Sequence, residues 1–259
     1  MGTYVIVSKY LKRKVLFDVY HSHGKKPVKP SMLVLFNDGQ DLIHCGLSSL
    51  LAELEAAKII KPMIVVGIHA GRERKQEYGI AGIPDYKGRG LKADTYTSFI
   101  LEELISFLHQ HFHKINDIPK VFAGFSLGGL SALDITWNHP DIFSQAGVFS
   151  GSLWWRSKSL EEEYNEDSRR IILQRIRNMP YQSGLKFFFE CGTEDEKEDR
   201  NQNGIIDAID DTLDVIDELV KKGYSYPGDI IYHEIPGGKH DVMTWKHALP
   251  AFFQFLSKD

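Results

Sequence analysis

The sequence predicts an α/β protein with a mostly parallel sheet and helices on both of its faces. Short runs rich in Val, Ile and Phe alternate with longer amphipathic stretches, an order typical of parallel strands joined by helices. Several runs are apolar on both faces, as central strands covered by helices are. Because the sequence has no internal repeat and no long linker, we expect residues 1–259 to form a single domain.

The elements follow from hydrophobic spacing. We expect strands at 15–20, 32–36, 63–69, 120–125, 146–151, 185–192 and 229–235. Leu and Ile recur every three or four residues in the predicted helices, at 42–57, 95–113, 127–138, 158–178, 207–222 and 241–257. The segment 70–94 is glycine-rich, charged and too long for a simple connection, which favours a functional loop over a site.

Composition limits the classes of partner. The net charge of −4 offers no basic surface, which argues against nucleic acid and an acidic membrane and favours a small-molecule ligand. The sequence shows no signal peptide and no apolar run that could span a bilayer, so we expect a cytoplasmic protein, with export through a trimmed signal as the alternative. Cys45 and Cys191 lie in apolar stretches and are predicted to be buried thiols. The sequence is also compatible with a homo-oligomer.

One serine stands at a predicted strand-to-helix corner. Ser126 lies in "GFSLG", after the strand "KVFAG" and before the helix that begins "LGGLSAL". This is the setting of a nucleophile elbow, in which glycines at 124 and 128 are needed where any Cβ would collide. The serine would also lie at a helix N-terminus, beside unpaired amides. The alternative is an ordinary turn with a serine N-cap.

A serine hydroxyl needs a base and an acid to act as a nucleophile. His240 is the candidate base, because it lies on a Pro-Gly-Gly loop between the last predicted strand and the last helix. Asp195 is the candidate acid, since it follows a strand and the Gly192 turn, with Glu194 as the runner-up. A solvated acidic loop is the alternative for either carboxylate.

Acyl chemistry also needs donors for the developing oxyanion. We expect the backbone N–H groups of Leu127, directly after the serine, and of Gln40, in the turn that opens at "NDGQ", to supply them. No cofactor is expected for catalysis.

These motifs resemble a known family. "NDGQ", "GFSLGG", "SGSLWW" and "GGKHD" followed by a tryptophan are similar to the Putative esterase family of α/β-hydrolases, over about Phe17 to Phe255. The resemblance implies a serine carboxylic-ester hydrolase that acts on a small or medium ester through an acyl-enzyme. It also implies Ser126 as nucleophile, His240 as base and the amides of Gln40 and Leu127 as the oxyanion hole. Its variable acid loop leaves Glu194, Asp195 and Asp199 open.

The alternatives to ester hydrolysis are an acyltransferase of the same fold and a non-catalytic ligand-binding module. For the substrate pocket, Trp154 and Trp155 are candidate aromatic walls, although a core role for one of them is an equal alternative. Arg72 and Tyr78 in the 70–94 loop are candidates for the polar end of a substrate, with surface solvation as the alternative.

A second motif fits a cation-binding loop. "DRNQNGIIDAID", from Asp199 to Asp210, has the spacing of an EF-hand calcium loop, with Gly204 at its sixth position. The predicted ligands of a structural Ca²⁺, or Mg²⁺, are Asp199, Asn201, Asn203, the carbonyl of Ile205, Asp207 and Asp210. The alternative is an Asn-Gly turn followed by carboxylates at the start of a helix.

Overall fold

One mixed sheet forms the centre of the molecule. The computed structural model describes residues 1–259 except 24–27, 113–114, 160–169 and 259. Within these residues the strands form an eight-stranded sheet in the order β1-β2-β4-β3-β5-β6-β7-β8. Their bounds are β1 Gly2–Val7, β2 Lys14–His21, β3 Met32–Asn37, β4 Met63–Ile68, β5 Lys120–Phe125, β6 Gln145–Phe149, β7 Lys186–Glu194 and β8 Ile230–Lys239. The β1–β2 and β2–β4 pairs are antiparallel, and the rest of the sheet is parallel.

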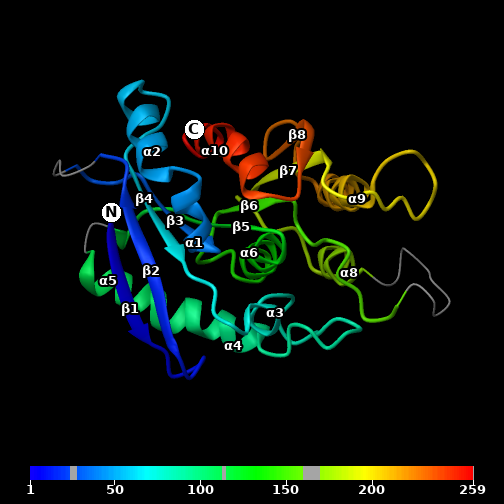
Figure 1. Cartoon of the computed structure of the whole chain (residues 1–259), viewed down its shortest axis with the longest axis horizontal. Helices are drawn as coiled ribbons and strands as arrows, with labels where there is room; N and C mark the ends of the chain where they lie inside the picture. Colours follow the sequence, from blue (N-terminus) through cyan, green and yellow to red (C-terminus); the bar gives the residue numbers. More distant parts are fainter. Residues whose placement is uncertain (24–27, 113–114, 160–169, 259) are drawn as a thin grey trace.

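Helices cover both faces of this sheet (Figure 1). One hydrophobic cluster joins the sheet to α1 Gly39–His44, α2 Leu47–Ala56 and α10 Val242–Leu256. The other joins it to α4 Ala93–Ser98, the π-helical η1 Phe99–Leu104, α5 Ile105–His111, α6 Leu127–Asn138, α8 Ile171–Asn178 and α9 Asp207–Lys222. The predicted α/β class, a mostly parallel sheet with helices on both faces, is confirmed.

Individual elements differ from the prediction for physical reasons. Strand β1 was not predicted, because it is an edge strand whose residues alternate between exposed and half-buried. The helix expected at 42–57 is two helices, because Gly46 adopts a φ of 68° between them. The helix expected at 158–178 is described only from Ile171, since 160–169 lie outside the described residues. The 70–94 loop contains a short helix, α3 Arg74–Glu77.

The parallel strands bring the predicted site residues to one edge of the sheet. Carboxyl ends of neighbouring parallel strands meet at the same edge, and ligands of such sheets bind there. Asp38 follows β3, Ser126 follows β5 and Ser150 follows β6. Asp195 follows β7, and His240 follows β8. Residues from five parts of the chain therefore converge at this edge.

Two further expectations concern the whole chain. Cys45 and Cys191 are both free and buried, as predicted. Among the helices that the structure describes, none is long and apolar enough to cross a membrane.

Candidate active site

The turn at Ser126 is a strained corner fixed by its neighbours. Ser126 has φ 55° and ψ −123°, a conformation that costs a non-glycine residue free energy. Its N–H donates to the Phe149 carbonyl at 2.8 Å, which ties the corner to β6. A Cβ at Gly124 would lie 2.5 Å from the carbonyl carbon of Gly128, so only glycine fits there. The corner leaves Ser126 partly exposed between buried neighbours.

The predicted oxyanion loop is packed against this corner. Asn37 donates from Nδ2 to the Gly128 carbonyl at 2.8 Å, which joins the two turns. Asp38 has φ 58°, and both of its carboxylate oxygens pair with Arg74, at 2.6 and 2.7 Å. The side chain of Gln40 accepts from the Ala70 N–H at 3.0 Å. Gln40 and Leu127 lie in the first turns of α1 and α6, where backbone N–H groups have no intrahelical partner.

The structure brings one of the three candidate acids to the candidate base. His240 Nδ1 lies 3.1 Å from Asp195 Oδ2, and Asp195 is buried. The side chain of Glu194 is 60% exposed and lies near Lys239. Asp199 accepts hydrogen bonds from the backbone N–H groups of its own loop, at positions 203 and 204. The geometry therefore favours Asp195 as the partner of the imidazole.

The candidate nucleophile Ser126 and the candidate base His240 are not hydrogen-bonded to each other. Within the part of the chain that the structure describes, the side-chain partner of Ser126 Oγ is Ser152 Oγ, at 3.4 Å. The side chain of His240 is 42% exposed. Catalytic hydrogen bonds are often long or absent in a ligand-free site and tighten when substrate binds.

Three buried residues behind Asp195 were missed by the sequence reasoning. Ser150 Oγ donates to Asp195 Oδ1 at 3.0 Å and accepts from Trp245 Nε1 at 2.9 Å. Glu190 is completely buried on β7. Burial, followed by the charge of Asp195, raises the pKa of Glu190 to about 8. Ser150 begins the motif "SGSLWW", and Trp245 follows the motif "GGKHD". Nothing in the sequence indicates that these two side chains are hydrogen-bonded to each other.

The four predicted pocket residues fall into two groups. Trp154 is half-buried and lines a cavity of about 280 Å³, together with Tyr86, Lys87, Arg89, Arg156, Glu196, Glu198 and Asp207. Arg72 is exposed. Tyr78 and Trp155, in contrast, are completely buried: Tyr78 OH accepts from the Asp38 N–H at 3.3 Å, and Trp155 donates to the Ile83 carbonyl at 3.0 Å. These two aromatic residues support the loops from behind and do not form a pocket wall.

The predicted cation loop is closed by its own hydrogen bonds. The side-chain amides of Asn201 and Asn203 both donate to Asp210 Oδ2 at 2.8 Å. Asp207 pairs with Arg200, with their charged atoms 3.2 Å apart. Among the described residues, no group of three or more His, Cys, Asp or Glu side chains is arranged to hold a metal ion. An EF-hand loop also uses amide and carbonyl oxygens. The cation site therefore stays a prediction.

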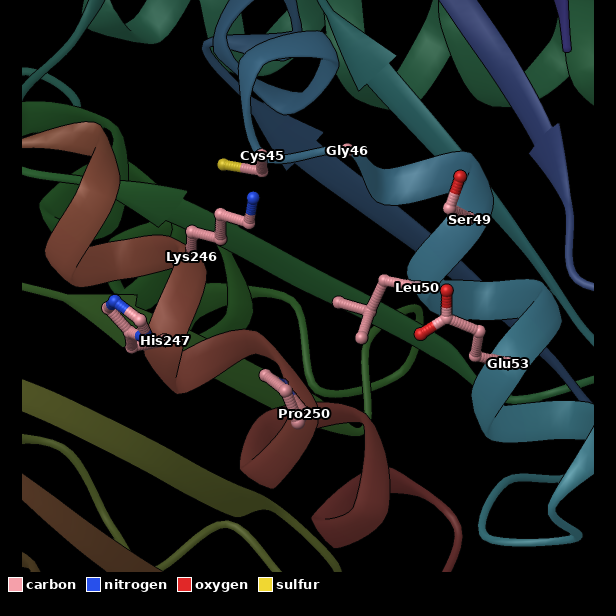
Figure 2. A pocket seen from close by; sticks show the side chains of 8 residues that line it. All are labelled: Cys45, Gly46, Ser49, Leu50, Glu53, Lys246, His247 and Pro250. Carbon is pink, nitrogen blue, oxygen red and sulfur yellow. The ribbon is translucent and has the colours of Figure 1, made fainter.

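A second cavity lies away from the predicted residues. It measures about 450 Å³ and lies between α2 and α10. Figure 2 shows Ser49, Leu50 and Glu53 on one side of it and Lys246 on the other, with the Lys246 amine pointing toward Cys45. None of the predicted catalytic or pocket residues lines this cavity.

Comparisons with known proteins place the chain in a family. Residues 8–256 match the family described as Putative esterase. The enterobactin esterase of Shigella flexneri is 18% identical with a TM-score of 0.74, over 98% of this chain and 58% of that one. A siderophore hydrolase from Aspergillus nidulans is 17% identical with a TM-score of 0.72, over 100% of this chain and 94% of that one. A serine hydrolase from Shewanella oneidensis is 19% identical with a TM-score of 0.73, over 99% of this chain and 79% of that one.

These likenesses assign the fold, and the family match assigns the family. The chain spans 58% of the length of the Shigella enterobactin esterase. No curated protein matches the sequence. The strand order and the similar structures correspond to the α/β-hydrolase fold. The chain therefore belongs to the Putative esterase family.

Proposed function

We propose that this protein hydrolyses carboxylic esters with Ser126 as nucleophile, His240 as general base and Asp195 as the acid that orients the imidazole. The observation that carries the proposal is the 3.1 Å contact between His240 Nδ1 and Asp195 Oδ2. It lies at the strand edge that also presents the strained Ser126 corner. An imidazole that a carboxylate orients in this way activates a serine hydroxyl on unrelated folds.

The contact determines which nitrogen can act as the base. A proton on Nδ1 is donated to the Asp195 carboxylate, which leaves Nε2 of His240 unprotonated and able to accept. Ser126 Oγ would turn from Ser152 toward this nitrogen as substrate binds. It then attacks the ester carbonyl carbon while its proton passes to His240.

The remaining steps of the proposed catalytic cycle use the same residues. The carbonyl oxygen becomes an oxyanion, which the N–H groups of Gln40 and Leu127 would stabilise from the first turns of two helices. The imidazolium returns its proton to the alcohol oxygen as the C–O bond breaks, which leaves the acyl group on Ser126. Water, deprotonated by His240, attacks this acyl-enzyme, and the acid is released with Ser126 restored.

We propose an ester with an aromatic ring in its acyl or alcohol part as the substrate class. The lining of the 280 Å³ cavity includes Trp154, two residues after Ser152, and Glu196, which directly follows Asp195. Arg89 lies 4.6 Å above the Trp154 ring. Similar structures include proteins named for enterobactin and for ferulic acid.

The test is pre-steady-state release of p-nitrophenol from phenylacetate and acetate esters. We expect a burst equal to the enzyme concentration, a higher kcat/KM for the aromatic acyl group, and complete loss of the burst in Ser126→Ala. A ligand-binding module would give no burst with the wild-type protein, and this result would refute the proposal. Transfer of the acyl group to added alcohols in preference to water would instead identify an acyltransferase.

A further inference from the structure

A tryptophan and a serine connect all three proposed catalytic residues. The Trp245 ring stacks on Phe125, the residue before Ser126, with centroids 4.5 Å apart and planes 9° apart. The same ring meets His240 edge to face at 5.4 Å. Its Nε1 reaches Ser150 Oγ at 2.9 Å, and this oxygen reaches Asp195 Oδ1 at 3.0 Å. One indole therefore contacts the nucleophile turn and the base, and reaches the acid through one hydroxyl.

The chemistry of the three groups determines which group donates in each of these two hydrogen bonds. An indole N–H can only donate, an ionised carboxylate can only accept, and a hydroxyl can do both. Trp245 must therefore donate to Ser150, and Ser150 must donate to Asp195. Since Asp195 Oδ2 is the oxygen that faces His240, this donor fixes the rotation of the carboxylate.

Because the three residues are buried, their hydrogen bonds are stronger than hydrogen bonds at the protein surface. Trp245 is 7% exposed, Ser150 2% and Asp195 9%. Hydrogen bonds to a charged group in such surroundings are stronger than those in water and polarise one another. Glu190 is buried beside them, and its raised pKa, caused by burial and then by the charge of Asp195, keeps it mostly neutral at pH 7. Of the two carboxyl groups, Asp195 is the one whose oxygens face the Ser150 hydroxyl and the His240 imidazole.

The backbone at Ser150 is itself held in place. Ser150 has φ 45°, an uncommon conformation for serine, and its N–H donates to the Glu190 carbonyl at 2.8 Å. The strain aims its hydroxyl from the end of β6 toward the end of β7.

From these contacts we propose that Trp245 and Ser150 are positioning residues: the indole N–H, acting through the Ser150 hydroxyl, holds the Asp195 carboxylate in the orientation that pairs with His240. This inference rests on the proposed function and adds two residues to it that act through Asp195.

The experiment measures kcat, KM and Tm for two variants and their combination. In Ser150→Ala we expect kcat to fall about 10- to 100-fold, with KM within about twofold, because Asp195 loses its charge-assisted donor. Trp245→Phe keeps a ring between Phe125 and His240 and removes the N–H. We expect it to lower kcat about 3- to 10-fold, since the hydroxyl still donates but is no longer polarised.

The double variant separates a positioning role from a structural one. Ser150→Ala leaves a buried indole N–H without an acceptor, so Tm falls, and adding Trp245→Phe removes that unpaired group and recovers part of the Tm. We expect kcat of the double variant to stay at the level of Ser150→Ala. A kcat that recovers together with Tm, or that falls by the product of the two single effects, would overturn the proposal.

Two matched controls complete the test. Ser144→Ala changes the serine at the opposite end of β6, and Trp137→Phe removes an indole N–H that has no hydrogen-bond partner among the described residues. Neither is expected to change kcat. If kcat in Ser150→Ala and Trp245→Phe also stays within twofold of wild type, the positioning role is refuted. Failure of the proposed function would look different, because wild-type protein would then show no Ser126-dependent burst at all.

Discussion

The two halves of the candidate site are held together by different kinds of force. The half that contains Ser126 and the predicted oxyanion loop depends on backbone shape: Ser126 and Asp38 have positive φ, and Gly124 leaves no room for a Cβ. The half that contains Asp195 and His240 depends on hydrogen bonds between side chains, through Ser150 and Trp245. Side-chain contacts of Asn37 and Arg74 also support the first half, and Ser150 in the second half has a positive φ. Steric fit nevertheless dominates the first half and charge and direction dominate the second, so different changes should break them.

The largest expected effect is on the hydrogen-bonded half. We expect Asp195→Asn to lower kcat by about 10³- to 10⁴-fold, because an amide at this position favours the wrong tautomer of His240. Steady-state kinetics with a p-nitrophenyl ester measure it. The matched control is Glu194→Gln on the neighbouring residue, whose exposed side chain should leave kcat within about twofold. A large loss in Glu194→Gln with little in Asp195→Asn would assign the acid to Glu194.

The half of the site that depends on steric fit should be destabilised when a side-chain atom is added to it. In Gly39→Ala the new Cβ would overlap the backbone of Gly67 on β4, where nothing can rotate away. We expect a loss of about 3 kcal/mol in the free energy of unfolding, measured by urea denaturation. Gly82→Ala is the control: φ is +76° there but the space is open, so about 1 kcal/mol is expected. Equal losses would show that steric fit does not distinguish this half.

The contrast also explains what the sequence could predict. Backbone strain leaves a mark in the sequence, because glycine is the residue that fits such positions. Ser126 and the turn at Gly39 were therefore recognisable, and so was the parallel sheet that carries them. Hydrogen bonds between side chains leave no such mark. The sequence favoured Asp195 over Glu194 only by its place after the turn, and the resemblance left Asp199 open as well. The fold then placed Asp195 beside His240.

The packing of the 70–94 loop could not be predicted from the sequence either. The glycine-rich segment 70–94 was predicted to be a functional loop over a site. Two of its glycines, Gly79 and Gly90, make room for the Trp155 ring, since a Cβ at either would lie 2.7 Å from it. Aromatic residues suit a pocket wall and a core equally well, so periodicity could not show that Tyr78 and Trp155 are buried.

The next effect concerns the pH dependence of stability in the hydrogen-bonded half, where the change per pH unit is smaller than the loss expected in Gly39→Ala. The pKa of Glu190 is raised by burial from 4.5 to about 8, so the folded protein keeps a proton that the unfolded chain releases. Between these values the free energy of unfolding should fall as pH rises, by up to about 1.4 kcal/mol per pH unit from this group, and level off above pH 8.

Glu190→Gln should remove this component. Urea denaturation of both proteins at pH 5, 6, 7 and 8 would give lines that diverge, with the variant gaining on the wild type as pH rises. Glu194→Gln should keep the wild-type slope. Parallel lines for wild type and Glu190→Gln would show that Glu190 is ionised throughout this range.

The smallest expected effect concerns the loop that follows Asp195. If residues 199–210 bind Ca²⁺, calcium at ten times its dissociation constant should add about 1.4 kcal/mol to the free energy of unfolding and raise Tm by a few degrees. Asp199→Ala should abolish this shift, whereas Asp217→Asn, an exposed change on α9, should keep it. A wild-type Tm that is the same in calcium and in chelator would remove the predicted site.

The central claim is that Ser126 is a nucleophile activated by His240, and covalent labelling tests it most directly. Intact-mass spectrometry after exposure to a fluorophosphonate should show one added phosphonyl group, located on Ser126 by peptide mapping. The label should be absent in Ser126→Ala and should form at least about 100-fold more slowly in His240→Ala. An unlabelled wild-type protein, or a label on another residue with Ser126 unmodified, would contradict the account.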